Sequence, residues 1–334
     1  MRMRLFVVIL VALAVLVTGV LAVREWSTLH RPANRTAAAV VIDEGLSGRE
    51  VLEILHRQDL LPSIRAGRLY LKLFSEGRSF HWGSYRFRVG TTPVEALERL
   101  LDGRVEMISV TVVEGSDVAT LAEQMTAAGI GTEDEWLAMA ARTEWITDLM
   151  PAATSLEGFF FPDTYRFAEA VDVATAARHM VDRFRAVWTE ERSGKSQLWG
   201  DDLDLVILAS LVEAETGVAG ERRRVAGVYV NRLRRGMLLQ CDPTVIFALK
   251  RRDEWNGRLL RVHWGVDDPY NTYRYPGLPP GPINSPGRAS LASSLDPEDH
   301  RYLYFVAAPG GGHTFSRTLA EHNRAVTIWQ RSRR

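Results

Sequence analysis

An uncharged apolar segment, residues 5–23, lies close to the start of the chain and limits what that part of it can fold into. A helix of this length rises about 28 Å, which is close to the roughly 30 Å hydrocarbon core of a bilayer. Arg2 and Arg4 precede the segment and favour a cytoplasmic N-terminus, although Arg24 follows it. The sequence therefore predicts a cytoplasmic tail over residues 1–4 and a transmembrane anchor over residues 5–23.

A cleaved signal peptide is the other interpretation of the same segment. Val20, Leu21 and Ala22 could form a small-residue cleavage site. No cysteine stands near the N-terminus, which excludes a lipoprotein anchor there. Both remaining interpretations place residues 24–334 outside the cytoplasm. With the anchor retained, we expect a single-pass protein of the inner membrane whose body lies on the periplasmic, extracytoplasmic side.

Composition bounds the rest of the molecule. The 334 residues are enough for two or three domains, and 46% hydrophobic with 25% charged residues is typical of a globular protein. Lys and Arg together number 41, as do Asp and Glu, and this balance argues against a dedicated nucleic-acid-binding protein. The only cysteine, Cys241, cannot form an intrachain disulfide, and the histidines show no metal-ligand spacing. We expect no metal and no cofactor.

A strand–turn–helix pattern recurs in the first third of the chain. Residues 45–52 resemble residues 90–97, and each segment follows a β-like stretch and opens a helix with a capping box. The two capping boxes pair Ser47 with Glu50 and Thr92 with Glu95. A looser third copy begins at Val110, and residues 64–74 predict a further helix between the first two copies.

These patterns predict an α+β protein made of a transmembrane helix, a small α+β module and a larger mixed α/β region. After the anchor we expect a tether over 24–37, the module over 38–106, a mainly helical connecting region over 107–200, and a region over 201–330 that holds the densest signals. In the connecting region, the aromatic run Glu157–Tyr165 predicts an extended segment or a turn whose rings pack in the core.

The last region combines two helices with a loop rich in proline and glycine. The pattern predicts helices over Leu203–Thr216 and Glu221–Arg235, with Gly236 as the C-terminal stop. Residues after Trp264 are too rich in turn formers for regular structure and predict an ordered surface loop. A buried strand over Tyr302–Ala307 and a closing helix over Thr318–Gln330 are expected to follow.

Two glutamates near the end of the first of these helices are the best candidates for chemistry. The chain has no nucleophile elbow, zinc-protease motif or dinucleotide fingerprint. Residues two apart on a helix point about 200° apart, so Glu213 and Glu215 cannot share a direction. Stepping by 100° from Leu205 places Glu215 between Leu208 and Leu211 on the apolar stripe, with Glu213 to one side.

A carboxyl group set in an apolar wall is costly to ionise. We therefore expect the pKa of Glu215 to be raised, so that the group can hold a proton near neutral pH and deliver it to a glycosidic oxygen. The competing interpretation is a structural glutamate that bonds to nearby backbone or to Thr216. The pattern alone leaves both open.

Several longer motifs make the chain resemble a known family. They are Val212–Thr216, the helix from Val225 to Leu233, Leu239–Val245, Tyr270–Tyr273, Gly277–Ile283, His313–Phe315 with His322-Asn323, and the aromatic run Glu157–Tyr165. Together they resemble the endolytic murein transglycosylase family, also described as YceG-like. The resemblance covers almost the whole chain. Cys241 is the one departure, because we expect a small polar residue there; a buried free cysteine behaves as a small hydrophobe and puts little in doubt.

The resemblance implies a fold and an activity. It implies that residues 38–106 form a LysM-like module and that Glu215 is catalytic. The implied reaction is non-hydrolytic cleavage of peptidoglycan glycan strands, a lyase reaction that leaves a 1,6-anhydro-MurNAc end and would terminate or trim nascent strands. Proximity to peptidoglycan synthases is also implied. Candidate residues for positioning sugar are Thr216, Asn231, Gln240, Asp242, Asn271, Tyr273 and His313.

Two other functions remain open from the sequence. One is a glycoside hydrolase on the same glycan, which would need a second carboxylate, either Glu213 or Asp242. The other is a non-catalytic scaffold that binds the cell wall through the LysM-like module.

Overall fold

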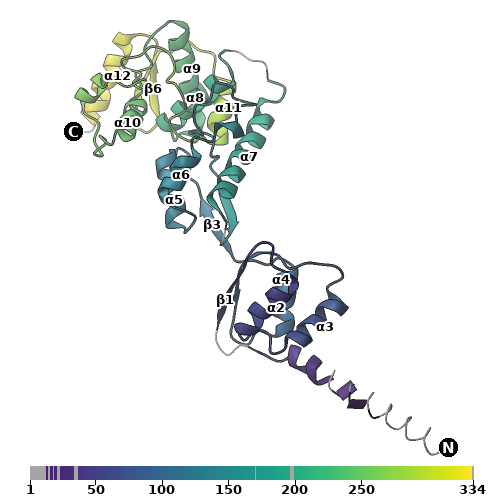
Figure 1. Ribbon diagram of the computed structural model, residues 1–334. Helices are drawn as coiled ribbons and strands as arrows, with labels where there is room; N and C mark the ends of the chain where they lie inside the picture. Colours follow the sequence, from purple (N-terminus) through teal and green to yellow (C-terminus); the bar gives the residue numbers. More distant parts are fainter. Residues whose placement is uncertain are drawn as a thin grey trace, which may run out of the picture. The chain divides into compact units, whose positions relative to one another are not determined.

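The computed structural model describes residues 13, 16–17, 19–20, 23–33, 37–169, 171–195 and 199–332. The chain divides into two compact units (Figure 1): unit 1 comprises Met1–Ile108 with Arg166–Val171, and unit 2 comprises Ser109–Tyr165 with Asp172–Arg334. The predicted α+β class is confirmed, with many helices and small two-stranded sheets in the described part of the chain. No helix among the described residues could cross a membrane, and most of the predicted anchor lies outside them.

Between residues 38 and 101, unit 1 combines a two-stranded antiparallel sheet with three helices. In chain order these are β1 (Ala38–Ile42), α2 (Gly48–Arg57), α3 (Ile64–Phe74), β2 (Gly83–Phe87) and α4 (Pro93–Leu101). In the sheet, Ala38 lies opposite Phe87 and Ile42 opposite Gly83. Fully buried aliphatic side chains of α2 and α4, among them Leu55 and Leu97, form one core with the strands.

Both predicted capping boxes are confirmed. The backbone N–H of Ser47 donates to Oε2 of Glu50 at 2.8 Å, and that of Thr92 donates to Oε2 of Glu95 at 2.8 Å. These bonds satisfy donors that a helix start leaves free. The two helices therefore begin where the sequence predicts them.

The segment predicted as an irregular tether is partly helical. Residues 23–29 form a helix, and Leu29 is buried in the core of unit 1. The ring of Trp26 lies 5.3 Å from the ring of Phe74 on α3. Trp26 and Leu29, spaced three apart, give the helix an apolar face that its polar neighbours obscure in the sequence.

Beyond residue 106 helices predominate, as expected for the connecting region over 107–200. In chain order the elements are β3 (Met107–Thr111), α5 (Val118–Ala127), α6 (Glu133–Met139), β4 (Thr164–Ala168), α7 (Val173–Arg192), α8 (Asp202–Glu215), α9 (Arg222–Arg234), α10 (Asp242–Arg251), α11 (Arg288–Leu295), β5 (Tyr304–Ala307), β6 (His313–Ser316) and α12 (Leu319–Ser332). Short 3₁₀ turns occur at Thr143–Trp145, Ala219–Glu221 and Arg261–Gly265.

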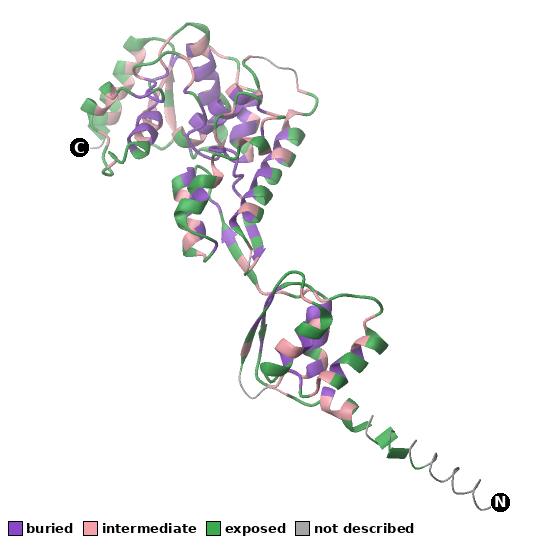
Figure 2. Ribbon diagram, in the orientation of Figure 1, coloured by how far each residue is buried: buried purple, intermediate pink, exposed green. Residues whose placement is uncertain are grey.

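Helix α8 forms the centre of unit 2, and its residues from Leu205 to Val212 are all buried (Figure 2). It packs against α9 and α11. The aromatic run before β4 also lies in the core, as predicted: Phe159 and Phe160 are fully buried, and the ring of Phe159 lies edge-on to that of Phe184, 5.0 Å away. A rigid apolar scaffold therefore holds the C-terminal end of α8 in place.

The strand predicted over Tyr302–Ala307 is shorter and less buried than expected. Strand β5 begins at Tyr304, and its four residues are all half-buried. Among the described strands β5 pairs only with β6, so the sheet is too narrow to enclose it. The run of apolar residues indicated a strand buried on both faces. A two-stranded ribbon packed against α12 does not bury both faces of β5.

Candidate active site

Helix α8 ends immediately after Glu215. Thr216 adopts an extended backbone, its N–H still donates to the carbonyl of Val212 at 3.2 Å, and its hydroxyl accepts from the N–H of Val218 at 3.0 Å. The Thr216 side chain is buried and shapes the turn that follows the helix. Glu215 is consequently presented at the edge of the apolar core and not along the side of the helix.

The Glu215 side chain lines a cavity of about 280 Å³ in unit 2. Helices α8, α9, α10 and α12, strand β5 and two loops contribute to its wall. The lining residues are Glu215, Tyr229, Arg232, Leu239, Gln240, Asp242, Tyr273, Tyr304, Phe305, Leu319 and His322. The cavity is thus rich in aromatic rings and hydrogen-bonding groups, a combination suited to a polar ligand with apolar faces.

Burial dominates the electrostatics of Glu215. It raises the pKa of the carboxyl group, and the hydrogen bonds from Cys241 and Tyr229, which lower the pKa, do not cancel it. The Tyr229 hydroxyl donates to Oε1 of Glu215 at 3.0 Å. Burial also raises the pKa of the Cys241 thiol, which stays protonated and able to donate. The carboxyl group can therefore hold a proton and can be stabilised after giving it up.

Glu213 has a different environment. Its Oε1 accepts from Nη2 of Arg222 at 3.4 Å, and its Oε2 accepts from the N–H of Gly287 at 3.0 Å. Glu213 does not line the cavity that contains Glu215. The two glutamates point to different partners, as their spacing on the helix predicts.

Asp242 and Tyr273 form a second polar group in the cavity wall. The Tyr273 hydroxyl donates to Oδ1 of Asp242 at 2.7 Å, and Nε1 of Trp264 donates to the same atom at 3.1 Å. The rings of Trp264 and Tyr273 stack, with centroids 4.9 Å apart. Gln240, also in the wall, has a positive φ of 50° just before α10 begins. Gln240, Asp242 and Tyr273 are the predicted sugar-positioning residues that reach the cavity beside Glu215.

The two predicted asparagines make internal bonds. Nδ2 of Asn231 donates to the carbonyls of His300 and Tyr302, at 2.8 and 3.1 Å. Nδ2 of Asn271 donates to two carbonyls of the preceding loop, at 3.0 and 2.7 Å. Neither side chain lines the Glu215 cavity. Both hold the backbone that shapes the cavity wall.

His313 pairs with Glu221. Its ring Nδ1 lies 2.7 Å from Oε2 of Glu221, and its backbone N–H donates to Oε1 at 2.9 Å. Burial alone would raise the pKa of Glu221, but these contacts lower it. The His313 ring packs edge-on against Phe305, which lines the cavity. His313 therefore lies behind the cavity wall.

Sequence reasoning missed several cavity residues because they lie far apart in the chain. Nε of Arg232 donates to the carbonyl of Leu303 at 2.6 Å, and its guanidinium lies 5.1 Å from the ring centroid of Tyr304. His322 packs against Tyr304, and its buried Nδ1 has no hydrogen-bond partner in the described part of the chain. The only sequence signal for His322 was its motif with Asn323; nothing in helical periodicity indicated Arg232 or Tyr229.

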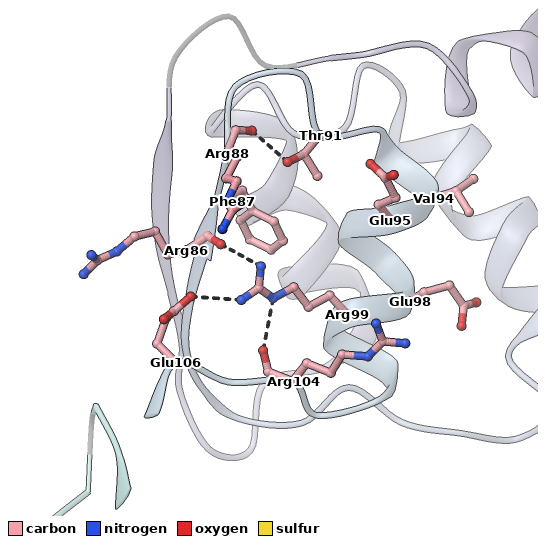
Figure 3. A pocket seen from close by; sticks show the side chains of 10 residues that line it. All are labelled: Arg86, Phe87, Arg88, Thr91, Val94, Glu95, Glu98, Arg99, Arg104 and Glu106. Atoms are coloured by element: carbon pink, nitrogen blue, oxygen red, sulfur yellow. Dashed lines mark hydrogen bonds and ion pairs between the residues drawn. The ribbon is translucent and has the colours of Figure 1, made fainter. Parts of the chain in front are cut away.

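A separate cavity of about 670 Å³ lies in unit 1 (Figure 3). Its three carboxylates all accept hydrogen bonds within the protein: Glu95 from Thr92, Glu98 from Tyr70 and Glu106 from Arg99. These three carboxylates are exposed or paired with arginine, whereas Glu215 is set at the edge of an apolar core, so Glu215 is the better candidate for acid–base chemistry.

The cavity in unit 2 thus has the features of an acid–base catalytic site centred on one carboxyl group. Comparison with known proteins gives the family. The sequence pattern of the YceG-like family matches residues 40–328, and the chain belongs to this family. The resemblance predicted from the motifs is confirmed.

Individual relatives agree with this assignment. The chain is 28% identical, over 87% of its length and 84% of the relative's, to a Bacillus subtilis protein named endolytic murein transglycosylase. A protein of the same name from Streptococcus pneumoniae is 32% identical over 51% of this chain and 32% of its own length. A crystal structure of a putative YceG-like protein from Listeria monocytogenes superposes with a TM-score of 0.56 and 26% identity, covering 87% of this chain and 99% of that one.

Proposed function

We propose that the chain is an endolytic peptidoglycan lytic transglycosylase, a lyase that cleaves the β-1,4 bond between MurNAc and GlcNAc within glycan strands. The observation that carries the proposal is the Glu215 carboxyl group, whose pKa burial raises at the edge of a polar cavity. The names of the relatives from Bacillus subtilis and Streptococcus pneumoniae support the substrate class.

In the proposed reaction Glu215 acts first as acid and then as base. The protonated carboxyl group gives its proton to the oxygen that leaves C1 of MurNAc, and the C1–O bond breaks. The C6 hydroxyl of the same sugar forms the new bond to C1 and returns its proton to Glu215. Since the nucleophile is already tethered to the reacting carbon, no second carboxylate is needed to activate water. The products are a free GlcNAc 4-hydroxyl and a 1,6-anhydro-MurNAc end.

The environment of Glu215 suits both steps. Burial favours the protonated form needed for the first step, and the donors Tyr229 and Cys241 stabilise the carboxylate left by proton transfer. We assign the positioning of sugar to Gln240, Asp242 and Tyr273, which line the cavity. Thr216, Asn231, Asn271 and His313 act indirectly, by fixing the backbone and the aromatic wall.

The decisive experiment digests uncrosslinked glycan strands with the full chain in water enriched in ¹⁸O. We expect products that end in 1,6-anhydro-MurNAc and carry no ¹⁸O. Glu215→Gln should abolish cleavage, while Glu213→Gln, a matched change two residues away, should retain it, with melting curves to confirm folding.

Each alternative function has its own outcome in this experiment. Reducing ends that contain ¹⁸O would establish a hydrolase, in which Asp242, the other carboxylate that lines the cavity, is the candidate second carboxylate. No cleavage by the folded wild-type chain would favour the non-catalytic wall-binding scaffold.

We further propose that residues 5–23 anchor the chain in the cytoplasmic membrane, with the body on the outer side, where the glycan substrate is located. Residues 38–106 would act there as a LysM-like wall-binding module beside peptidoglycan synthases. Protease added to intact spheroplasts should remove the body of the chain if this orientation holds, and protection would refute it. Crosslinking in those cells would show whether synthases lie close by.

A further inference from the structure

One face of helix α3 in unit 1 is apolar, basic and exposed. Leu69 and Leu73 are 38% and 58% exposed, although α3 also has a buried side. At 100° per residue they form a stripe beside a second stripe made of Arg65, Arg68 and Lys72. Helix α3 contains no acidic residue. This pattern is typical of helices that lie in a membrane interface.

The N-terminal helix of unit 1 extends the apolar surface. The Trp26 ring contacts the rings of Tyr70 and Phe74, at centroid distances of 6.5 and 5.3 Å. Trp26 and Phe74 remain 37% and 42% exposed. Tyr70 itself is buried, but Phe74 directly follows Leu73, so the C-terminal end of α3 and the neighbouring Trp26 together expose apolar side chains.

The position of Trp26 in the chain indicates that this surface lies close to the membrane. Trp26 stands three residues after Val23, the last residue of the proposed anchor, and residues 23–29 are helical. Three helical residues rise about 4.5 Å, which is less than the depth of one headgroup layer, roughly 5–8 Å. Leu29, buried in the core, fixes the same helix to unit 1. Unit 1 therefore has little freedom to move away from the bilayer into which the anchor runs.

We propose that this face of unit 1, formed by Trp26, Leu69, Leu73 and Phe74 with the basic row Arg65, Arg68 and Lys72, rests on the outer leaflet of the membrane. The inference rests on the proposed anchor and goes beyond the proposed activity. The aromatic and leucine side chains enter the interfacial region, where Trp is enriched, and the basic row contacts anionic headgroups. Helix α3 thereby sets the orientation of unit 1 on the bilayer.

The test measures the depth of two sites in the full chain, reconstituted in phosphatidylcholine nanodiscs with or without phosphatidylglycerol. Spin labels are placed by Leu73→Cys and, as a matched control, by Val41→Cys. Val41 is 54% exposed on β1, on the other side of unit 1 from α3 (Figure 1). The native Cys241 is fully buried, and the parent chain without an added cysteine measures any background labelling. Collision with oxygen and with a water-soluble nickel chelate reports depth.

We expect the label at position 73 to collide several-fold less with the nickel chelate than the label at position 41, and more with oxygen. Reversing the basic row by Arg65→Glu, Arg68→Glu and Lys72→Glu should reduce this protection, most clearly with phosphatidylglycerol. Equal nickel accessibility at both positions would overturn the proposal. Protection accompanied by spin–spin broadening that depends on chains per disc would assign the face to a second copy instead.

Separate measurements test the proposed anchor, the proposed membrane-facing surface and the proposed reaction. A chain that does not float with lipid would overturn the anchor and the proposed surface together. Strand cleavage, assayed separately, would still report on Glu215 and on the proposed reaction.

Discussion

At the scale of single residues, the proposed chemistry depends on opposing influences on one carboxyl group. Burial raises the pKa of Glu215, whereas the donors Cys241 and Tyr229 lower it. A general acid works best when its pKa lies near the working pH, so the balance of these influences sets the range in which the site can act. Of these two donors, the Tyr229 hydroxyl can be removed with the smaller change, because Tyr229→Phe keeps the aromatic ring.

Tyr229→Phe should shift the pH dependence of strand cleavage. Removing the hydroxyl takes a donor from the carboxylate form of Glu215, so its pKa rises further. A hydrogen bond to a charged group contributes roughly 1.5–3 kcal/mol, so the shift should be about one to two pH units. Because the acid form is lost as pH rises through the pKa, activity of the variant should persist to higher pH. Measuring kcat/KM against pH checks this; Tyr165→Phe, which removes a buried tyrosine hydroxyl elsewhere, should leave the profile in place.

Glu157 predicts a pH dependence of stability. Burial raises the pKa of this carboxyl group to about 8, although it accepts hydrogen bonds from the N–H of Val118. The folded-state pKa exceeds the unfolded value of about 4.5, so the protonated group favours folding at low pH, and this contribution is lost as pH rises towards 8. At about 1.4 kcal/mol per pKa unit, the loss is at most about 5 kcal/mol. Glu157→Gln should flatten this part of the dependence.

The measurement is the free energy of unfolding of the full chain in detergent, from urea titrations at pH 5 and pH 9. Wild type should lose more stability between these two values than Glu157→Gln. If both chains lose the same amount, the raised pKa of Glu157 is not coupled to folding.

The directions of Glu213 and Glu215 could be predicted from the sequence, because the spacing of apolar residues in α8 shows that the two side chains lie on different sides of the helix. Helical periodicity could not predict the other residues of the cavity wall, among them Tyr229, Arg232, Tyr304 and His322. They reach the cavity from α9, β5 and α12, and their proximity depends on how these elements pack together. Local periodicity carries no information on such contacts between distant parts of the chain.

At the scale of elements, helix ends were more predictable than strands. Capping boxes are local, and hydroxyl and carboxyl groups three residues apart fix where α2 and α4 begin. The half-buried state of β5 instead depends on its having β6 as its sheet partner. The helix over residues 23–29 was missed for a similar reason, since only its packing against unit 1 shows that Leu29 is a core residue.

Gly227 lies where α9 closely approaches the segment that precedes β5. A Cβ atom there would lie 2.4 Å from the carbonyl oxygen of Glu298 and 2.7 Å from Nε2 of His300. Alanine in a helix interior normally stabilises by about 1 kcal/mol relative to glycine. Here the backbone clash outweighs that gain, and we expect Gly227→Ala to destabilise by roughly 1–3 kcal/mol.

Thermal melting checks this prediction against Arg234→Ala, an exposed change on the same helix that should alter stability by less than about 0.5 kcal/mol. A stabilised Gly227→Ala variant would mean that the segment at residues 298–300 moves away from α9 without cost. Cleavage should fall together with stability, because the same segment supplies the carbonyls that hold Asn231.

At the scale of the whole molecule, the two units have separate hydrophobic cores. One core contains Leu55 and Leu97 in unit 1, and another contains Leu208 and Tyr229 in unit 2. The sequence predicted a small module that ends near residue 106, followed by a connecting region over 107–200 and a further region over 201–330. It did not indicate that residues 166–171 return to unit 1, because that depends on the pairing of β3 with β4.

Separate cores predict separate unfolding. Leu97 is fully buried in unit 1, so Leu97→Ala should destabilise that unit by about 2–5 kcal/mol and leave the core around Glu215 unchanged. Calorimetry of the full chain in detergent should then show one transition moving to lower temperature while another stays in place. Cleavage of short soluble strands, which requires the cavity of unit 2 alone, should persist at temperatures between the two transitions. A single transition that moves as a whole would show instead that the two cores unfold cooperatively.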